Sequence, residues 1–487
     1  MLHNKVGELK LFSLFGHFSL LLALSFVTLG AQSFKDFKRS QSKSFQTYKD
    51  ERDNAFNSYL KQHWKAYDVQ DSDPLYEKPK PKEIIPAEVI KTKPVGPKIV
   101  IKIKKPVQIE AEPTIVKKPI DAVKQKDINF DFYGTHLEFD IPDGIKKANF
   151  YPQNQKGIAN FFSNAASSEY ENFIVKIQNI SKIMNLNDWG TYLLVSKISN
   201  MTYSNQDNSR LLGWFIFNKM GYSVKIGLAK THVVLMHYSQ KVIYSTPNYN
   251  FDNKKYYVVA NYAKGSIGRL FSYKQEYPGS TKPLDLSLKT LPNLKQNIRN
   301  KTLEFEYFGD VCSVPFEYNK NLIDFMATYP QADYETFFNA PVDGRTYETI
   351  ALGLKKYIDG KKASDAINFV LNFVQKAFKY ERDNQQFGRE KVMFAQETLY
   401  FDKSDCEDRA VLFSYLIKEL FGVGVLGVKY KDHMATAPQV PMEGDKIKTG
   451  LRKFILADPT YVNATVGMSM PQYKSIKPQS YIVVRKD

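Results

Sequence analysis

Aromatic residues recur at helical spacing in the first patterned stretch of the chain. Between Ser33 and Tyr67, apolar side chains return at steps of three, four and seven residues, and charged residues fill the positions between them. This period is typical of an amphipathic helix with one apolar face. We therefore predict that residues 32–72 form one long helix whose aromatic face packs on the body of the protein.

Residues 127–264 show a helical period first and a strand-like period afterwards. Asp188 stands at a predicted helix start as its cap, and Gly221 is a typical C-terminal helix signal. The predicted helices are Ile158–Asn164, Tyr170–Met184, Asp188–Leu194 and Leu211–Met220, and the predicted strands are Ser223–Leu228, Val233–His237, Val242–Ser245 and Tyr256–Val259. Helices followed by strands indicate an α+β domain.

A similar order returns in residues 341–487, after a β-rich connector at 265–340 that has strands near Ser266–Tyr273 and Leu303–Phe308. In 341–487 the predicted helices are Tyr347–Tyr357, Ala363–Phe378 and Cys406–Phe421, and the predicted strands are Val423–Tyr430, Met434–Ala437, Phe454–Asp458 and Tyr481–Arg485. The fold class indicated is α+β, with two α+β domains behind a long N-terminal helix.

Two stretches differ from these domains in composition. Residues 1–31 have a basic start, an apolar run and then small residues, which is the layout of a secretory signal peptide. Residues 73–126 are rich in Lys and Pro, which predicts an extended, solvated linker in which Lys98–Lys104 could add to a sheet edge. We expect an exported protein, periplasmic or in the cell envelope, that contacts a membrane only through an uncleaved signal segment.

The formal net charge of +17 raises the question of an anionic partner. Much of the excess lies in the Lys/Pro-rich stretch, and no zinc finger, RNP-like strand or basic heptad helix accompanies it. We therefore expect no nucleic-acid partner. An electrostatic tether to an acidic envelope surface, or a peptidoglycan-binding role for residues 77–126, stays open.

The two cysteines stand in different surroundings. Cys312 lies in a strand-like run, which favours a buried structural thiol. Cys406 stands at the start of an apolar helix, where partial positive charge and free N–H groups favour the nucleophilic thiolate. Its neighbours Asp405 and Asp408 oppose that effect, so they must cap the helix, point away or bind a cation such as Arg409. We assign Asp405, Asp408 and Arg409 structural roles beside the site.

A nucleophilic cysteine needs a base, and His433 is the only histidine in the same helix–strand unit as Cys406. Its imidazole could take the thiol proton and later return it to a leaving amine. Asp458 ends the next predicted strand and is placed to orient the ring. Because each of the three residues stands at the end of a successive element, their side chains can converge.

These three motifs together resemble the transglutaminase-like superfamily, in particular its exported bacterial cysteine peptidases. The likeness covers roughly the last third of the chain and rests on Asp-Cys-Glu-Asp-Arg at a helix start, His-Met-Ala on the next strand, and Asp-Pro-Thr. It implies a papain-like α+β core, in which the cysteine helix packs on an antiparallel sheet. It also implies Cys406, His433 and Asp458 as the catalytic triad, and a thioester at Cys406 that water or an amine resolves.

Two positions depart from the common pattern of that family. Ser404 stands where a common member has Gly, and Met434 follows the histidine where many members have Ala, so details of the substrate channel do not carry over. The oxyanion donor is open between the Cys406 backbone N–H and the side-chain amides of Gln396 and Gln385. No Cys or His pair has metal-ligand spacing, so we expect no metal and no cofactor.

Residues 127–264 also echo the cysteine-bearing unit. In both, an Arg, an apolar helix, a Gly, a strand and a His follow one another, beginning at Arg210 and at Arg409. Aligning the two arginines places Asp207 where Cys406 stands. The sequence leaves open whether this is a degenerate copy without its nucleophile or a chance likeness.

The sequence therefore predicts an exported cysteine enzyme that acts as a peptidase or amidase on a protein or peptide substrate, such as one of the cell envelope. A protein cross-linking acyltransferase is one alternative. The other is a non-enzymatic envelope scaffold or interaction protein that keeps the fold, which the aromatic helix and the Lys/Pro-rich stretch favour. Reactivity of Cys406 toward a mild alkylating reagent separates enzyme from scaffold. No pattern indicates an oligomeric state.

Overall fold

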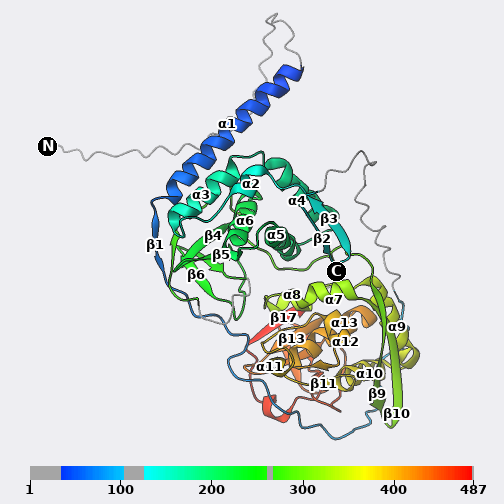
Figure 1. Ribbon diagram of the computed structural model, residues 1–487. Helices are drawn as coiled ribbons and strands as arrows, with labels where there is room; N and C mark the ends of the chain where they lie inside the picture. The colour runs from blue at the N-terminus through cyan, green and yellow to red at the C-terminus, as the bar shows by residue number, and fades with distance from the viewer. Residues whose placement is uncertain (1–33, 104–125, 260–266, 485–487) are drawn as a thin grey trace, which may run out of the picture. The chain divides into compact units, whose positions relative to one another are not determined.

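The computed structural model describes residues 34–103, 126–259 and 267–484 (Figure 1). Within them the chain is a mixed α+β protein with thirteen α-helices and mostly antiparallel sheets, which confirms the predicted class. Its contacts define two compact units, residues 1–51 and 52–487. Among the described helices, none combines the length and the apolar composition that a membrane span requires. The predicted signal segment lies outside the described residues.

The N-terminal helix is shorter than the aromatic period predicts. Helix α1 spans Phe34–Leu60, and the chain then enters strand β1, Trp64–Tyr67, which pairs antiparallel with β8, Leu270–Tyr273. The prediction of one helix as far as Tyr67 is therefore wrong. The period misleads because an edge strand that packs aromatic rings uses the same residue types: the rings of Tyr67 and Phe251 lie 4.2 Å apart.

The last turns of α1, residues 52–60, pack on the helices and strands that follow. Phe56 is fully buried, and its ring meets that of Phe162 edge-on at 5.3 Å. Close by, the buried carboxylate of Asp53 forms an ion pair with Lys219. The predicted packing of the aromatic face on the body of the protein is confirmed for this part of the helix.

The elements up to residue 273 build a six-stranded sheet, a separate two-stranded hairpin and a set of helices. They are β2 (Ile128–Phe132), β3 (Thr135–Phe139), α2 (Asp143–Lys147), α3 (Gln155–Ala166), α4 (Glu171–Ile183), α5 (Asp188–Thr202), α6 (Gln206–Lys219), β4 (Val224–Ala229), β5 (His232–Tyr238), β6 (Asn248–Phe251), β7 (Lys254–Tyr257) and β8. The sheet order is β1-β8-β4-β5-β7-β6, with every pair antiparallel, and α6 packs on β4 and β5. The predicted order of helices before strands is confirmed.

Two local predictions in this region are wrong. Val242–Ser245 is a loop rather than a strand, because its backbone N–H groups bond to the carbonyls of Asp73 and Gln331 instead of a neighbouring strand. Asn187, and not Asp188, caps α5: its side chain accepts a backbone N–H of the first turn at 3.1 Å. The second error lies at the end of a helix, where a pattern of residue types is least informative.

His237 in β5 is a buried histidine that makes the fold sensitive to acid. Both ring nitrogens lack a hydrogen-bond partner, and the ring packs against Tyr192 and Phe217. Burial lowers the pKa of His237 from 6.5 to about 3. Between these two values the unfolded chain binds a proton that the folded chain does not. Stability is therefore lost as the pH falls below 6.5.

We expect His237 to remove about 2 kcal/mol from the free energy of unfolding between pH 7 and pH 5. Urea unfolding at both pH values, for wild type and for His237→Phe, measures this contribution. The variant keeps a buried ring of similar size and should lose about 2 kcal/mol less over the interval. Equal losses in the two proteins would contradict the assignment of His237 as a buried neutral base.

The remaining elements begin with a long hairpin and end with the sheet that carries the predicted site. They are β9 (Ile298–Tyr307), β10 (Asp310–Asn319), α7 (Lys320–Ala327), α8 (Tyr334–Phe338), α9 (Gly344–Ile358), α10 (Ala363–Lys376), β11 (Lys379–Tyr380), α11 (Asp383–Gln386), α12 (Ala395–Tyr400), β12 (Lys403–Ser404), α13 (Cys406–Phe421), β13 (Val425–Lys429), β14 (Met434–Pro438), β15 (Lys446–Thr449), β16 (Arg452–Ile455), the 3₁₀ helix η1 (Pro471–Tyr473) and β17 (Ser480–Val484). Strand β13 lies between β14 and β17, antiparallel to both, and α13 packs on β13 and β14. The predicted helix Cys406–Phe421 is confirmed.

The strands β13–β17 follow the same spatial order as the strands β4–β8 of the first sheet. A bridge between Thr436 and Ala457 places the chain after β16 alongside β14, and β15 pairs with β16, so the order is β17-β13-β14-β16-β15. The order β8-β4-β5-β7-β6 in the first sheet follows the same path along the chain. In each case the preceding helix, α13 or α6, packs on the next two strands. This likeness supports the degenerate copy, which stays a prediction.

Residues 73–103 run along the surface of the protein and bond to it. The prediction of a solvated linker is therefore wrong for these residues. Ala87 N donates to Val462 O at 2.9 Å, and a single bridge joins Lys98 to Lys362. The predicted edge strand Lys98–Lys104 is reduced to that bridge within the described residues. The Lys/Pro composition misleads because a proline-rich chain has no regular structure whether it is solvated or bound to a surface.

Candidate functional site

Hydrogen bonds to an acidic side chain fix the start of helix α13. Asp408 Oδ2 accepts from Asp405 N at 3.2 Å, and its Oδ1 accepts from Met393 N at 2.8 Å, which ties the first turn to the preceding loop. Cys406 is the first residue of the helix, and Gly422, in the left-handed conformation with φ of 66°, ends it. The thiol therefore lies at the positive end of the helix dipole, as predicted.

His433 and Asp458 form a buried pair. His433 Nε2 lies 2.8 Å from Asp458 Oδ2, and the two side chains are 0% and 2% exposed. The second carboxylate oxygen, Oδ1, accepts the backbone N–H groups of Thr460 and Tyr461 at 2.9 and 3.2 Å, so the carboxylate cannot rotate freely. Because Nε2 faces Asp458, Nδ1 is the nitrogen left for another partner. It is buried without one.

Tyr473 is a residue of this site that the sequence analysis missed. Its ring stacks on His433, with 4.7 Å between ring centroids and 16° between the planes. Burial raises the pKa of its hydroxyl, and the charges of Asp432 and Cys406 raise it further. Tyr473 therefore lies near both the imidazole and the thiol. No motif marks it, because it is held by the short helix η1 between loops of ordinary composition.

The Cys406 thiol is fully buried and has two polar neighbours. It donates a hydrogen bond to Glu407 Oε2 at 3.1 Å, and Tyr76 Oη lies 3.9 Å from Sγ. Burial, and then the charges of Glu407 and Asp405, raise the pKa of the thiol well above its usual range. No hydrogen bond joins Cys406 to His433 among the residues that the structure describes. These surroundings therefore favour the neutral thiol, and the helix dipole does not outweigh burial and the neighbouring carboxylates.

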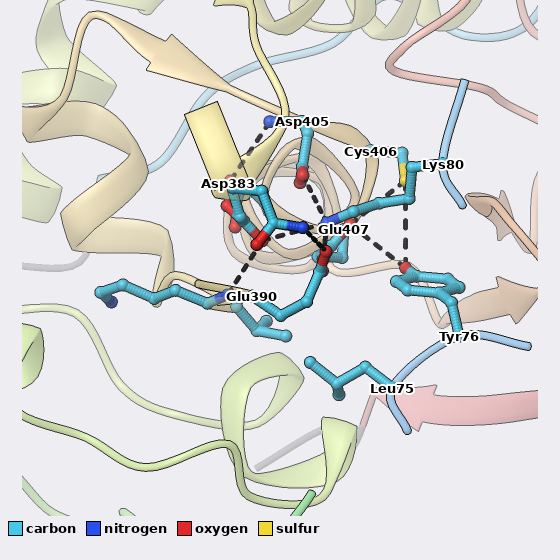
Figure 2. A network of polar contacts seen from close by, with 12 residues as sticks. Leu75, Tyr76, Lys80, Asp383, Glu390, Asp405, Cys406 and Glu407 are labelled. Carbon is cyan, nitrogen blue, oxygen red and sulfur yellow. Dashed lines mark hydrogen bonds and ion pairs between the residues drawn. The ribbon is translucent and has the colours of Figure 1, made fainter. Parts of the chain in front are cut away.

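The carboxylates around Cys406 do not point away, because they surround a buried ammonium. Lys80 Nζ lies 2.5 Å from Asp405, 2.8 Å from Glu407, 2.9 Å from Glu390 and 3.0 Å from Asp383, as Figure 2 shows. Burial disfavours the charged ammonium, but the charges of Asp405 and Glu407 raise the pKa of Lys80 well above its usual range. Lys80 belongs to residues 73–82, which we call the covering segment.

One ammonium cannot neutralise all of these carboxylates. Burial, followed by the charge of Glu407, raises the pKa of Asp405 well above its usual range and that of Asp383 to about 7. Burial is the largest influence on Glu407 and acts in the same direction, but the charge of Lys80 together with hydrogen bonds from Asp405 and Lys80 lowers the pKa of Glu407. Charge is therefore favoured most on Lys80 and Glu407, and burial favours the neutral form of Asp405.

The same carboxylates could hold a metal ion. Three overlapping groups place their ligand atoms within 4.8 Å of one another, and their members are Asp383, Glu390, Asp405, Cys406, Glu407 and Asp408. A set dominated by carboxylate oxygens suits a hard cation. The sequence analysis weighed only Cys and His spacings and so did not consider this cluster, whose members come from separate elements. Lys80 Nζ lies among these oxygens.

Arg409 has a structural role. Its hydrogen bonds in the described part of the chain go to a hydroxyl and two carbonyls, so of the alternatives left open, pairing with a carboxylate is not the one that they show. It is 1% exposed and donates to Ser404 Oγ at 3.0 Å, to Gln375 O at 3.1 Å and to Phe378 O at 2.7 Å. Burial lowers the pKa of Arg409 to about 10. The guanidinium therefore joins the first turn of α13 to the end of α10 and the residues after it.

The two glutamines predicted as oxyanion candidates differ in exposure and in hydrogen bonding. Gln385 is exposed on α11. Gln396, on α12, is buried, and its Oε1 accepts from Asp343 N at 2.8 Å while its Nε2 is buried without a partner. Neither bonds to Cys406 or His433 within the described part of the chain. Their role stays a prediction.

In the suggested degenerate copy, the positions that correspond to Cys406 and His433 hold an acid and a histidine, and these two form a pair. Asp207 lies in the first turn of α6, and its Oδ2 is 3.2 Å from Nδ1 of His232, the first residue of β5. Arg210 Nη1 bonds to Oδ1 of the same carboxylate at 3.1 Å. Unlike His433, the His232 side chain is 73% exposed. This pair has no nucleophile and no enclosed imidazole.

No protein-family model, no curated protein and no solved structure matches the chain. What the site does must therefore be argued from its own geometry, namely a buried His433–Asp458 pair, a stacked Tyr473 and a thiol at the start of α13.

Proposed function

We propose that the chain is a transglutaminase-like cysteine enzyme that cleaves or transfers an amide acyl group through a thioester at Cys406. The observation that carries the proposal is the buried His433–Asp458 pair, whose Nδ1 has no partner. A buried histidine that binds a carboxylate on one nitrogen and leaves the other vacant is oriented as a general base. Tyr473 stacks on this imidazole and helps to hold the ring in place.

The fold supports the same proposal. A cysteine at the start of α13, a histidine just before β14 and an aspartate just after β16 lie on one helix and two neighbouring strands of an antiparallel sheet. That is the arrangement that a papain-like transglutaminase core implies. The core assignment thus belongs to the proposal and rests on topology together with the three residues.

The proposed reaction begins when His433 Nδ1 takes the proton of Cys406. The thiolate sulfur attacks the amide carbonyl carbon, the C–N bond breaks, and the imidazolium returns its proton to the leaving amine. Cys406 is then a thioester. Water that loses a proton to Nδ1 attacks this thioester, which releases a carboxylic acid and regenerates the thiol. Asp458 positions the ring and stabilises the imidazolium.

Acetylation of Cys406 by p-nitrophenyl acetate tests the proposal. We expect a burst of p-nitrophenolate and an acetyl group on the Cys406 peptide, and we expect His433→Ala to slow the burst by about 10² to 10⁴-fold, because general-base catalysis contributes that much. Cys406→Ala is the blank. Both histidine forms are also compared in a Tyr76→Ala chain, where the thiol is less covered. A rate that does not depend on His433 in either chain would contradict the proposal.

One observation favours the second candidate function, a non-enzymatic envelope scaffold that keeps this fold. The Cys406 thiol is 0% exposed and bonds to Glu407 rather than to His433. A scaffold needs no reactive thiol, so in that case Cys406 should resist acetylation and alkylation even when Tyr76 is replaced by Ala. The acetylation experiment separates the two functions.

A further inference from the structure

The covering segment presents its side chains to the site selectively. Leu75 and Lys80 are 1% and 4% exposed, and the ring of Tyr76 is half-buried, whereas Glu77 and its next two neighbours face solvent. The segment has no regular secondary structure, and its backbone is attached at separate points: Glu77 N and Lys78 N donate to the carbonyl of Lys431, and the carbonyls of Leu75 and Pro81 accept from the hydroxyls of Tyr334 and Tyr380. Its contacts with the site are therefore made by a few side chains.

Those side chains lie directly on the proposed nucleophile. Tyr76 Oη is 3.9 Å from Cys406 Sγ and donates to Glu407 Oε2 at 3.2 Å. The same Glu407 accepts the thiol hydrogen through Oε2 and binds Lys80 through Oε1 at 2.8 Å. Figure 2 shows the side chains of Tyr76 and Lys80 directed toward Cys406 and the carboxylates. While these contacts persist, they limit the access of an acyl group to the sulfur.

We propose that the covering segment is an intramolecular inhibitor, with Tyr76 as the cap over Cys406 and Lys80 as the latch in the carboxylate cluster, and that it must move before substrate reaches the thiol. This inference rests on the proposed function, since it concerns the regulation of the same site. The protein in this structure is then the latent form.

The surroundings of the covering segment are consistent with a segment that can move away from the site. A cavity of about 320 Å³ lies against it, lined on one side by residues 74–80 and on the other by Ser245, Arg382, Asn384 and Glu390. The segment is thus held at separate points, with open space beside it. Segments with few buried apolar contacts and exposed backbone open at lower free energy than the core does. The latch itself is ionic, which ties the closed state to the charge at position 80.

Alkylation of Cys406 by iodoacetamide at pH 7.5, followed by peptide mass analysis, tests the inhibitor in the full chain. We expect Tyr76→Ala and Lys80→Met to label at least roughly tenfold faster than wild type, because each removes one closing contact. Lys78→Ala is the matched control: it removes an exposed lysine from the same segment and should label as wild type does. Far-UV circular dichroism and the thermal midpoint show that each variant is folded.

A peptide of residues 73–88 added to Tyr76→Ala supplies a second readout. The natural peptide should slow the labelling again, and the same peptide with Lys80→Ala should not. Equal labelling of wild type, Tyr76→Ala and Lys80→Met would overturn the inhibitor. Tyr76→Ala leaves the charged cluster intact, so it decides the question even if Lys80→Met does not fold.

The two proposals fail in different ways. Fast labelling of Tyr76→Ala without any dependence on His433 would keep the inhibitor and remove the enzyme. Fast, His433-dependent labelling of the wild-type chain, unchanged by Tyr76→Ala, would keep the enzyme and remove the inhibitor.

Discussion

Asp458→Asn should lower the rate of Cys406 acetylation by about 10⁴-fold, the loss expected when the acid of a catalytic triad becomes an amide. Oδ1 of Asp458 accepts two backbone N–H groups, from Thr460 and Tyr461. In the variant the amide oxygen must stay there, so the NH₂ group faces His433 Nε2. Nε2 then accepts a hydrogen bond, and the ring proton moves to Nδ1, which can no longer take the thiol proton.

Asp458→Ala is the informative control for this prediction. It removes the orienting group but does not force the ring proton onto Nδ1, so it should lose less activity than Asp458→Asn although it changes the structure more. The amide variant keeps the shape of the side chain and the two backbone hydrogen bonds, and its thermal midpoint should stay close to that of wild type. A rate for Asp458→Asn within a factor of about ten of wild type would contradict the role of Asp458 as the group that sets the tautomer.

Arg409→Ala should lower the free energy of unfolding by about 3 to 5 kcal/mol, because it leaves buried acceptors without donors and a cavity in their midst. The guanidinium donates to Ser404 Oγ, Gln375 O and Phe378 O, all buried. Arg409→Lys keeps the charge but cannot reach the three acceptors from one ammonium, so its cost should be intermediate. Urea unfolding measures both.

Arg345→Ala is the matched control for the loss of an arginine. Arg345 is a surface residue of α9, and its ion pair with Glu317, at 3.1 Å, joins side chains that are 56% and 36% exposed. Surface pairs of this kind contribute about 0 to 1 kcal/mol. If the two Arg→Ala variants had equal effects, Arg409 would not be the buried connector between α13 and α10 that the structure shows.

The sequence pattern predicted the features that depend on residues close together in the chain. The helix Cys406–Phe421 was predictable at both ends, since a polar run precedes it and a glycine follows it. His433 and Asp458 were predictable because each stands next to a strand with clear periodicity, although only the structure shows the 2.8 Å contact between them. The prediction of the N-terminal helix is wrong beyond Leu60 because aromatic residues suit a strand edge as well as a helix face.

The surroundings of Cys406 were not predictable from local patterns. Lys80 is more than 300 residues away from Asp383, Asp405 and Glu407 along the chain, and it stands in a stretch whose composition is typical of a solvated linker. Tyr473 likewise reaches His433 from a short 3₁₀ helix without a motif. A long-range ion pair and a ring stack have no signature in the spacing of residues, so both require the fold.

The pH dependence of iodoacetamide labelling of Cys406 in the Tyr76→Ala chain, with His433 present or replaced by Ala, tests the central claim most directly. Peptide mass analysis separates Cys406 from the buried Cys312. The account predicts an apparent thiol pKa that is lower when His433 is present than in His433→Ala. Labelling of Cys406 as an ordinary free thiol in both chains, or no labelling in either, would contradict the activated cysteine–histidine pair.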